Sequence, residues 1–307
     1  MHQAWERIIS APGLNTAKYT HEGGTRHFRL VAEPIQHKIL QDVELNTFGF
    51  NGTTPGPLII VHEGDWVNLT VDNRTNEPTA LHVHGLSKPN SEDGVPEIEP
   101  TPLIKPGESY TYRFLAWQNG TFFYHSTQQL QSNFGLVGPF IVLPRTPWQM
   151  PDRDYVLQLQ QWEIPQPELG RVTPGTYHPS RFQRNPNFFT INGRAFPLTV
   201  PLYTGMGERV RLRFVQRSNN SHTMHLHGHD FKVVSIDAFA QPESFRDTIN
   251  IAPGTRWDVE LSANNPGAWP LVGTKPFHTS NNGETPGGMM TRLIYQRRTL
   301  NKKYKLA

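Results

Sequence analysis

The sequence predicts an all-β fold made of two tandem Greek-key β-sandwich domains. Three observations support this prediction. Turn-forming residues are frequent, with Gly 25 and Pro 27, and aromatic residues make up 11% of the chain. Polar and apolar residues alternate in several short segments, and the two halves of the chain repeat the same motifs in the same order. Because many turns with short alternating segments are typical of β-sandwiches, we expect domains at residues 1–147 and 148–307.

The alternation is clearest in residues 67–72 and 209–214. In the first segment, valine and leucine alternate with asparagine, threonine and aspartate. In the second, Arg209, Arg211 and Arg213 alternate with apolar residues. Period two with one apolar face predicts a half-buried antiparallel strand. We therefore expect the arginines to lie on a solvent-facing side of their strand.

The internal repeat is visible in three pairs of motifs. FNGTTPGP, LHVHG and FFYHST in the first half correspond to INGRAFP, MHLHGH and KPFHTS in the second. In this repeat, His82 corresponds to His225 and His125 corresponds to His278. Self-similarity of this kind indicates a duplicated domain, each copy about the size of a single β-sandwich.

Composition excludes several functions. The net charge of +3 is small, and no nucleic-acid-binding motif accompanies it, so we expect no nucleic-acid partner. The longest aliphatic run, Leu58–Val61, is too short to cross a bilayer, and the N-terminal residues show no secretory signal pattern. The chain has no cysteine, which excludes disulfides, thiolate metal ligands and cysteine nucleophiles.

Histidine is the residue type that indicates chemistry. The chain has 14 histidines, and many of them fall in four short clusters: LHVHG, FFYHST, SHTMHLHGHDF and KPFHTS. Residues two apart on a strand project from the same face, so each His-x-His pair can direct two imidazoles at one site. A lone histidine is most often structural, whereas two such pairs at matching places in a repeat favour a metal site. Imidazole without thiolate suits copper, zinc or nickel.

On these motifs the chain resembles the two-domain multicopper oxidases, the small laccase-like branch built from cupredoxin domains. The resemblance extends from FNGTTPGP through DGVPEIEPTPLIKPGESYTYRF, GLVGPFIV and HTMHLHGHDF to PGGMM. It implies cupredoxin-like domains and copper as the cofactor. In this family a type 1 copper takes electrons from the substrate, and a cluster of one type 2 and two type 3 coppers reduces dioxygen to water.

The resemblance also implies a set of ligands. The type 2 copper would be held by His82 and His225, and the type 3 coppers by His84, His125, His227 and His278. His229 matches no ligand position, and we expect it to have a structural hydrogen-bonding role.

The last cluster departs from the family pattern in KPFHTSNNGETPGGMM. Laid on the family motif, Thr279 stands at the cysteine, and Ser280 and Glu284 stand at the next two histidines. His222, Glu284 and Met289 are then the remnants of a degenerate type 1 site. Because a blue site needs a thiolate, we expect no blue copper. Glu284 could join His222 in a hard metal site, but we favour the interpretation that Glu284 is a solvated residue on a loop.

One type 3 ligand is missing from the second cluster as well, because Thr127 stands where the family has a histidine. Six histidines remain, and three functions stay open. The chain could be a copper-dependent oxidoreductase of altered or weak activity, with phenolic donors and dioxygen or peroxide. It could instead bind or buffer copper without catalysis, or be a metal-free structural or interaction protein. Zinc-dependent hydrolysis lacks a supporting motif.

The resemblance carries expectations about assembly and location too. It implies a homotrimer, in which each metal site lies between the first domain of one subunit and the second domain of the next. It implies copper ions or a small molecule as partners, and an extracellular or periplasmic location.

Overall fold

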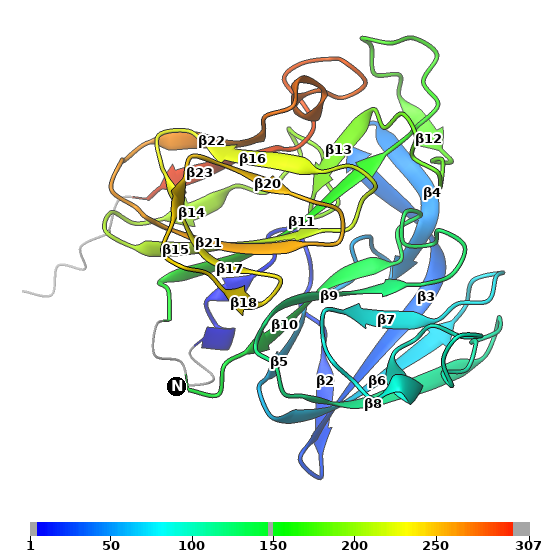
Figure 1. The fold of residues 1–307 in the computed structure, drawn as a ribbon. Helices are drawn as coiled ribbons and strands as arrows, with labels where there is room; N and C mark the ends of the chain where they lie inside the picture. The colour runs from blue at the N-terminus through cyan, green and yellow to red at the C-terminus, as the bar shows by residue number, and fades with distance from the viewer. Residues whose placement is uncertain (1–4, 147–149, 297–307) are drawn as a thin grey trace, which may run out of the picture.

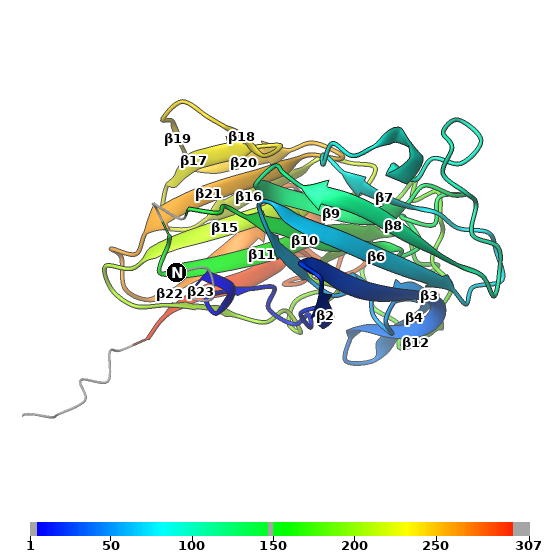
Figure 2. The same ribbon diagram turned by 90° about the horizontal axis from the view of Figure 1, so that it is seen from below.

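The computed structural model describes residues 5–146 and 150–296. Within them the chain consists almost entirely of strands, arranged as two packed sandwiches side by side (Figures 1 and 2). The all-β fold class predicted from the sequence is confirmed. Two short 3-10 helices, η1 (Asn90–Glu92) and η2 (Pro276–Thr279), lie in connecting segments.

The first sandwich has one sheet in the order β12-β4-β3-β6-β8, with β2 paired to β3, and a second in the order β5-β10-β9-β7. The strands of the larger sheet are β2 (Tyr19–Glu22), β3 (Thr25–Leu40), β4 (Val43–Phe50), β6 (Asp65–Asn73), β8 (Ser109–Ala116) and β12 (Gly175–Tyr177). Those of the smaller sheet are β5 (Ile59–His62), β7 (Leu81–His84), β9 (Gly120–Ser126) and β10 (Val137–Leu143).

The second sandwich has sheets in the orders β1-β11-β15-β21-β17-β18 and β14-β23-β22-β16-β20. In the larger sheet, β13 also pairs with β11 and β19 with β17; its strands are β1 (Ile9–Ser10), β11 (Arg153–Trp162), β13 (Phe188–Ile191), β15 (Arg209–Gln216), β17 (Phe231–Ile236), β18 (Phe239–Ala240), β19 (Phe245–Arg246) and β21 (Arg256–Ser262). The smaller sheet contains β14 (Leu202–Thr204), β16 (His222–Leu226), β20 (Thr248–Ile251), β22 (Ala268–Gly273) and β23 (Met290–Tyr295).

The strand orders show the duplication directly. The strand order β5-β10-β9-β7 in the first sandwich corresponds to the order β14-β23-β22-β16 in the second. In both sheets the first two strands of this order are parallel. Likewise β4-β3-β6-β8 corresponds to β13-β11-β15-β21, with a parallel pair at the same place. Strand β7 is therefore the counterpart of β16, and β9 is the counterpart of β22.

The register of these counterparts corrects one part of the sequence alignment. His82 on β7 lies opposite His125 on β9, whereas His225 on β16 lies opposite Val272 on β22. The counterpart of His125 is thus Val272, and the expected match of His125 with His278 is wrong. His278 comes after the strand, in η2. The two histidines were matched because each follows an aromatic residue. His278, however, lies beyond the end of β22 and not on that strand.

Each sandwich has its own apolar core, and a third cluster joins them. Phe123 and Ile141 from the first sandwich pack with Val156 and Val215 from the second. Two strands also cross over, because β1 pairs with β11 and β12 pairs with β4. The proposed boundary between residues 147 and 148 lies outside the described residues.

Strand β15 shows the alternation predicted from its sequence, but it has no solvent face. Every residue from 210 to 216 is buried, because β9 of the first sandwich covers the arginine side. Arg213 pairs with Asp154 at 2.7 Å and with Asp258 at 3.2 Å, and it donates to the Thr121 hydroxyl of the first sandwich. The expected solvated arginine face is therefore wrong for Arg213, which holds the two sandwiches together.

Candidate metal centre

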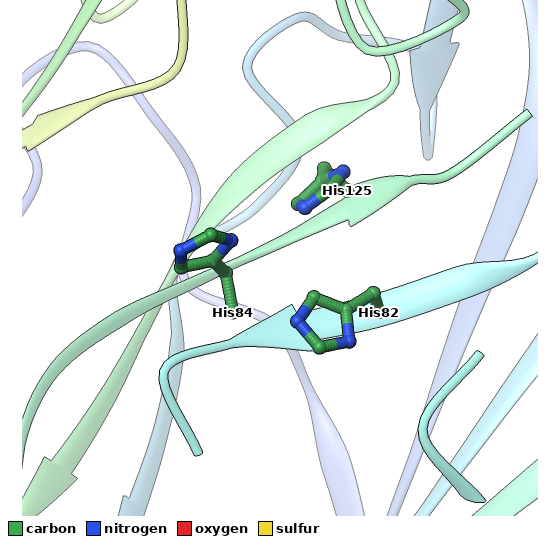
Figure 3. Close-up of side chains that lie close together, drawn as sticks. All are labelled: His82, His84 and His125. Carbon is green, nitrogen blue, oxygen red and sulfur yellow. The ribbon is translucent and has the colours of Figure 1, made fainter. Parts of the chain in front are cut away.

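Three histidines converge on the outer face of the smaller sheet of the first sandwich. His82 and His84 alternate with buried Leu81 and Val83 on β7, and His125 lies opposite His82 on β9. One nitrogen from each of the three rings lies within 4.8 Å of the others (Figure 3). Within residues 5–146 and 150–296, no other group of three such ligating side chains comes together.

Hydrogen bonds set which ring nitrogen faces the site. The His82 Nδ1 lies 2.7 Å from the Asp93 carbonyl oxygen, and the His125 Nδ1 lies 2.8 Å from that of Ser126. Since a carbonyl only accepts, each Nδ1 carries the proton and each Nε2 keeps its lone pair. The His125 Nε2 is buried and has no hydrogen-bond partner in the described part of the chain. This donor set suits a copper ion.

The imidazoles are neutral at physiological pH. Burial, followed by the positive charge of Arg256, lowers the pKa of His84 to about 4. Burial also holds the pKa of His125 well below its usual value, and Arg217 adds to this effect. The Phe123 ring stacks on His84 with its centroid 4.6 Å away. Neutral rings held in place by packing have their lone pairs available for a metal.

The second sandwich presents a matching pair. His225 lies on β16 and His227 directly after it, and they alternate with the buried residues Met224 and Leu226. Their ring centroids lie 5.0 Å apart. The Nδ1 of His225 lies 2.7 Å from the Asp247 carbonyl oxygen, so its Nε2 is also left as the ligand atom. His227 is exposed. The two rings repeat the placement of His82 and His84.

His278 does not share a face with this pair. Its ring centroid lies 4.8 Å from that of His222, which is buried on the core side of β16. His225 projects from the opposite side of the same strand. The implied placing of His278 beside His227 at a type 3 copper is therefore contradicted, because the sheet separates the two rings.

Glu284 of the last cluster lies apart from the three-histidine site. Glu284 is exposed, and its carboxylate accepts a hydrogen bond of 3.0 Å from the Val172 amide. Sequence reasoning did not place Gly273, the last residue of β22, beside His278. A Cβ placed on it would lie 2.8 Å from the Cβ and 3.1 Å from the Nδ1 of His278. Only the ladder register identifies this position.

His229 makes hydrogen bonds within the second sandwich. Its Nε2 lies 2.6 Å from the Tyr295 hydroxyl, and its Nδ1 lies 3.0 Å from the His227 carbonyl oxygen. Both ring nitrogens are thus satisfied without a metal.

Two duplicated β-sandwiches with outward imidazole pairs at matching strands define a cupredoxin-like protein with a candidate metal centre. Models of the multicopper oxidase family match residues 32–147 and 148–296. The chain is similar to a crystal structure of a blue copper oxidase from Nitrosomonas europaea, at 33% identity and a TM-score of 0.78, covering 88% of this chain and 85% of that one. The chain belongs to the multicopper oxidase family, whose metal is copper.

Two further relatives extend the comparison. A structure described as the multicopper oxidase mgLAC is 32% identical with a TM-score of 0.78, covering 92% of this chain and 89% of that one. The multicopper oxidase MmcO of Mycobacterium tuberculosis is 28% identical over 82% of this chain and 54% of its own length. The chain thus spans about half the length of this curated relative. Within residues 5–146 and 150–296, no helix is long and apolar enough to cross a membrane.

Proposed function

We propose that this protein binds copper through His82, His84 and His125 and acts as a copper-dependent oxidoreductase of altered or weak activity. The observation that carries the proposal is the convergence of the three rings, with ligand nitrogens within 4.8 Å of one another. The carbonyl partners of His82 and His125 orient the rings before a metal arrives. Preorientation of this kind strengthens binding by imidazoles.

The chemistry differs from that of a blue oxidase. The chain has no cysteine, so it lacks the thiolate that receives electrons from a distant donor. A bound copper would supply one-electron exchange between a donor that reaches the site itself and dioxygen or peroxide as the acceptor. Arg217 and Arg256 lie close enough to lower the pKa of His84, and their charge favours anionic or electron-rich donors such as phenolates.

We further propose that His225 and His227 of one subunit complete the site of a neighbouring subunit in a homotrimer. These two rings lie on the outer face of their sheet, and the Asp247 carbonyl orients His225 as Asp93 orients His82. Copper ions and a small phenolic molecule are the proposed partners, and an extracellular or periplasmic site of action is proposed with them.

A second candidate function is copper binding or buffering without turnover, and the missing thiolate favours it. A metal-free interaction protein fits less well, because the buried His125 Nε2 has no partner among the described residues. Leaving a buried polar atom unsatisfied costs about 1–3 kcal/mol, which a bound metal offsets.

The test is the copper content of the purified, copper-loaded protein and its electron paramagnetic resonance spectrum. We expect a non-blue Cu(II) signal in the full chain, and the loss of that copper in His125→Ala. His21→Ala, which removes an exposed histidine on β2, serves as the control and should keep all of it.

Three results separate the candidates. Oxidation of a phenolic dye that disappears in His125→Ala supports the enzyme. Copper binding without dye oxidation supports the buffering protein. Copper content that is equal in the full chain and in His125→Ala contradicts the proposed site.

A further inference from the structure

Thr127 directly follows β9 and lies two residues beyond His125. The multicopper oxidase pattern has a histidine at this position, whereas the present chain has a hydroxyl. The hydroxyl has a definite partner, because Thr127 Oγ1 donates to the Gly94 carbonyl oxygen at 2.7 Å. A hydroxyl has a single proton to donate, so this bond sets its direction. Thr127 is therefore tied to the segment around Gly94.

The segment that Thr127 holds is also the one that orients His82. The Asp93 carbonyl oxygen lies 2.7 Å from the His82 Nδ1, and the next carbonyl along the chain is the one that Thr127 bonds. The Asp93 carboxylate lies 3.3 Å from the same ring nitrogen. A displacement of Gly94 would therefore move the acceptor that keeps the proton on the His82 Nδ1.

The same segment packs closely against β7. Gly94 is buried and has a φ of +91°, and a Cβ placed on it would overlap the Leu81 carbonyl oxygen and lie 3.1 Å from the His82 amide nitrogen. The Gly94 amide donates to the Thr101 hydroxyl at 3.1 Å. The glycine is thus fixed by β7 on one side and by Thr101 at its amide. Thr127 fixes its carbonyl.

We infer that Thr127 is a positioning residue for the three-histidine site. Its hydroxyl holds the Asp93–Gly94 segment, and through that segment it keeps the His82 ring oriented with Nε2 available to a metal. The position of a lost ligand thus keeps a role at the same site without touching the metal. The inference rests on the proposed copper function and extends it by naming what holds one of the ligands.

The first test compares ring orientations in the metal-free full chain. Thr127→Val removes the hydroxyl and keeps a side chain of similar shape. ¹⁵N NMR at about pH 8, above the ordinary pKa of histidine, should show the His82 ring resonances moving away from those of a fixed Nδ1–H form. The His125 resonances should stay in place, because the Nδ1 of that ring bonds to the Ser126 carbonyl. Thr127→Ser keeps a hydroxyl and should retain the His82 resonances of the full chain.

The second test measures Cu(II) affinity by competition with a chelator. Thr127→Val should weaken Cu(II) binding about tenfold, since losing a partner of a metal ligand typically costs about 10–100-fold. Thr127→Ser should bind about as tightly as the full chain. Thr199→Val is the matched control, because its hydroxyl also donates to a carbonyl at 2.7 Å, that of Met290 in the second sandwich, and its loss should change neither measurement. Circular dichroism and a cooperative thermal transition establish that each variant is folded.

Three outcomes would overturn the inference. One is a folded Thr127→Val protein whose His82 resonances match those of the full chain. Another is undiminished Cu(II) affinity in that variant, and the third is an equal loss of affinity in Thr127→Ser. If the full chain binds no Cu(II), the proposed function fails, whereas the His82 resonances of the metal-free variants still decide whether Thr127 holds the ring.

Discussion

The two groups of histidines differ in the ring nitrogen that each presents. His82, His125 and His225 each direct Nδ1 at a main-chain carbonyl and leave Nε2 as the ligand atom. In His222 and His278, by contrast, Nδ1 has no hydrogen-bond partner within the described residues. The residue types in the sequence predicted a metal-binding chain. They could not predict these orientations, because each depends on a carbonyl or hydroxyl that folding brings beside the ring.

The position of Gly273 gives a prediction at this scale. Gly273→Cys, loaded with Cu(II), should develop an intense visible thiolate-to-copper band, because the new sulfur would lie beside the neighbouring imidazoles of His278 and His222. The ring of His278 must first shift, since the added Cβ would lie 2.8 Å from its Cβ. Absorption spectroscopy measures the result.

Thr279→Cys is the matched control for that substitution. The sequence alignment places the family cysteine at Thr279, but this residue lies in η2 and its hydroxyl bonds to the Pro276 carbonyl. We expect no such band there. A band in Thr279→Cys and none in folded Gly273→Cys would contradict the placing of position 273 beside the imidazoles.

At the level of elements, periodicity predicted the strands but not their environment. Residues 67–71 on β6 keep the expected alternation of buried and partly exposed side chains. Strand β15 has the same period, yet both of its faces are buried, because the second sandwich packs against the first there. A polar face looks the same in sequence whether water or an ion-pair network covers it. The partners of Arg213 are distant in sequence, so the alternation alone could not identify them.

Arg213 gives the prediction for this network. Arg213→Ala should lower the free energy of unfolding by about 3–5 kcal/mol, because it leaves the buried carboxylates of Asp154 and Asp258 without their cation. Arg209→Ala on the same strand removes a half-exposed partner of Glu260 and should cost less than about 1 kcal/mol. Urea unfolding measures both. Similar losses in the two variants would contradict a structural role for the buried network.

At the scale of the whole molecule, the sequence predicted the fold class, the duplication and the histidines that converge at the first site. LHVHG and FFYHST were enough for His82, His84 and His125, because adjacent strands of one sheet carry them. His278 was misplaced for a physical reason. The side of the sheet on which His278 lies depends on the length of chain between the end of β22 and η2. The motif spacing in the sequence does not show where the strand ends.

The proposed assembly gives a prediction at this scale as well. Because His225 and His227 face outward, a copper site that uses them needs a neighbouring subunit. Light scattering of the copper-loaded protein should give three times the chain mass of 35.0 kDa. A monomer that holds its full complement of copper would contradict the trimer and would leave the three-histidine site intact.

The position of the bound copper can be measured in a crystal. Crystals of the copper-loaded full chain, measured at the copper absorption edge, provide an anomalous difference map that needs no assumption about activity. We expect a copper peak bounded by the Nε2 atoms of His82 and His125 and by the ring of His84. A map with no copper among these three rings, in crystals that contain copper elsewhere, would contradict it.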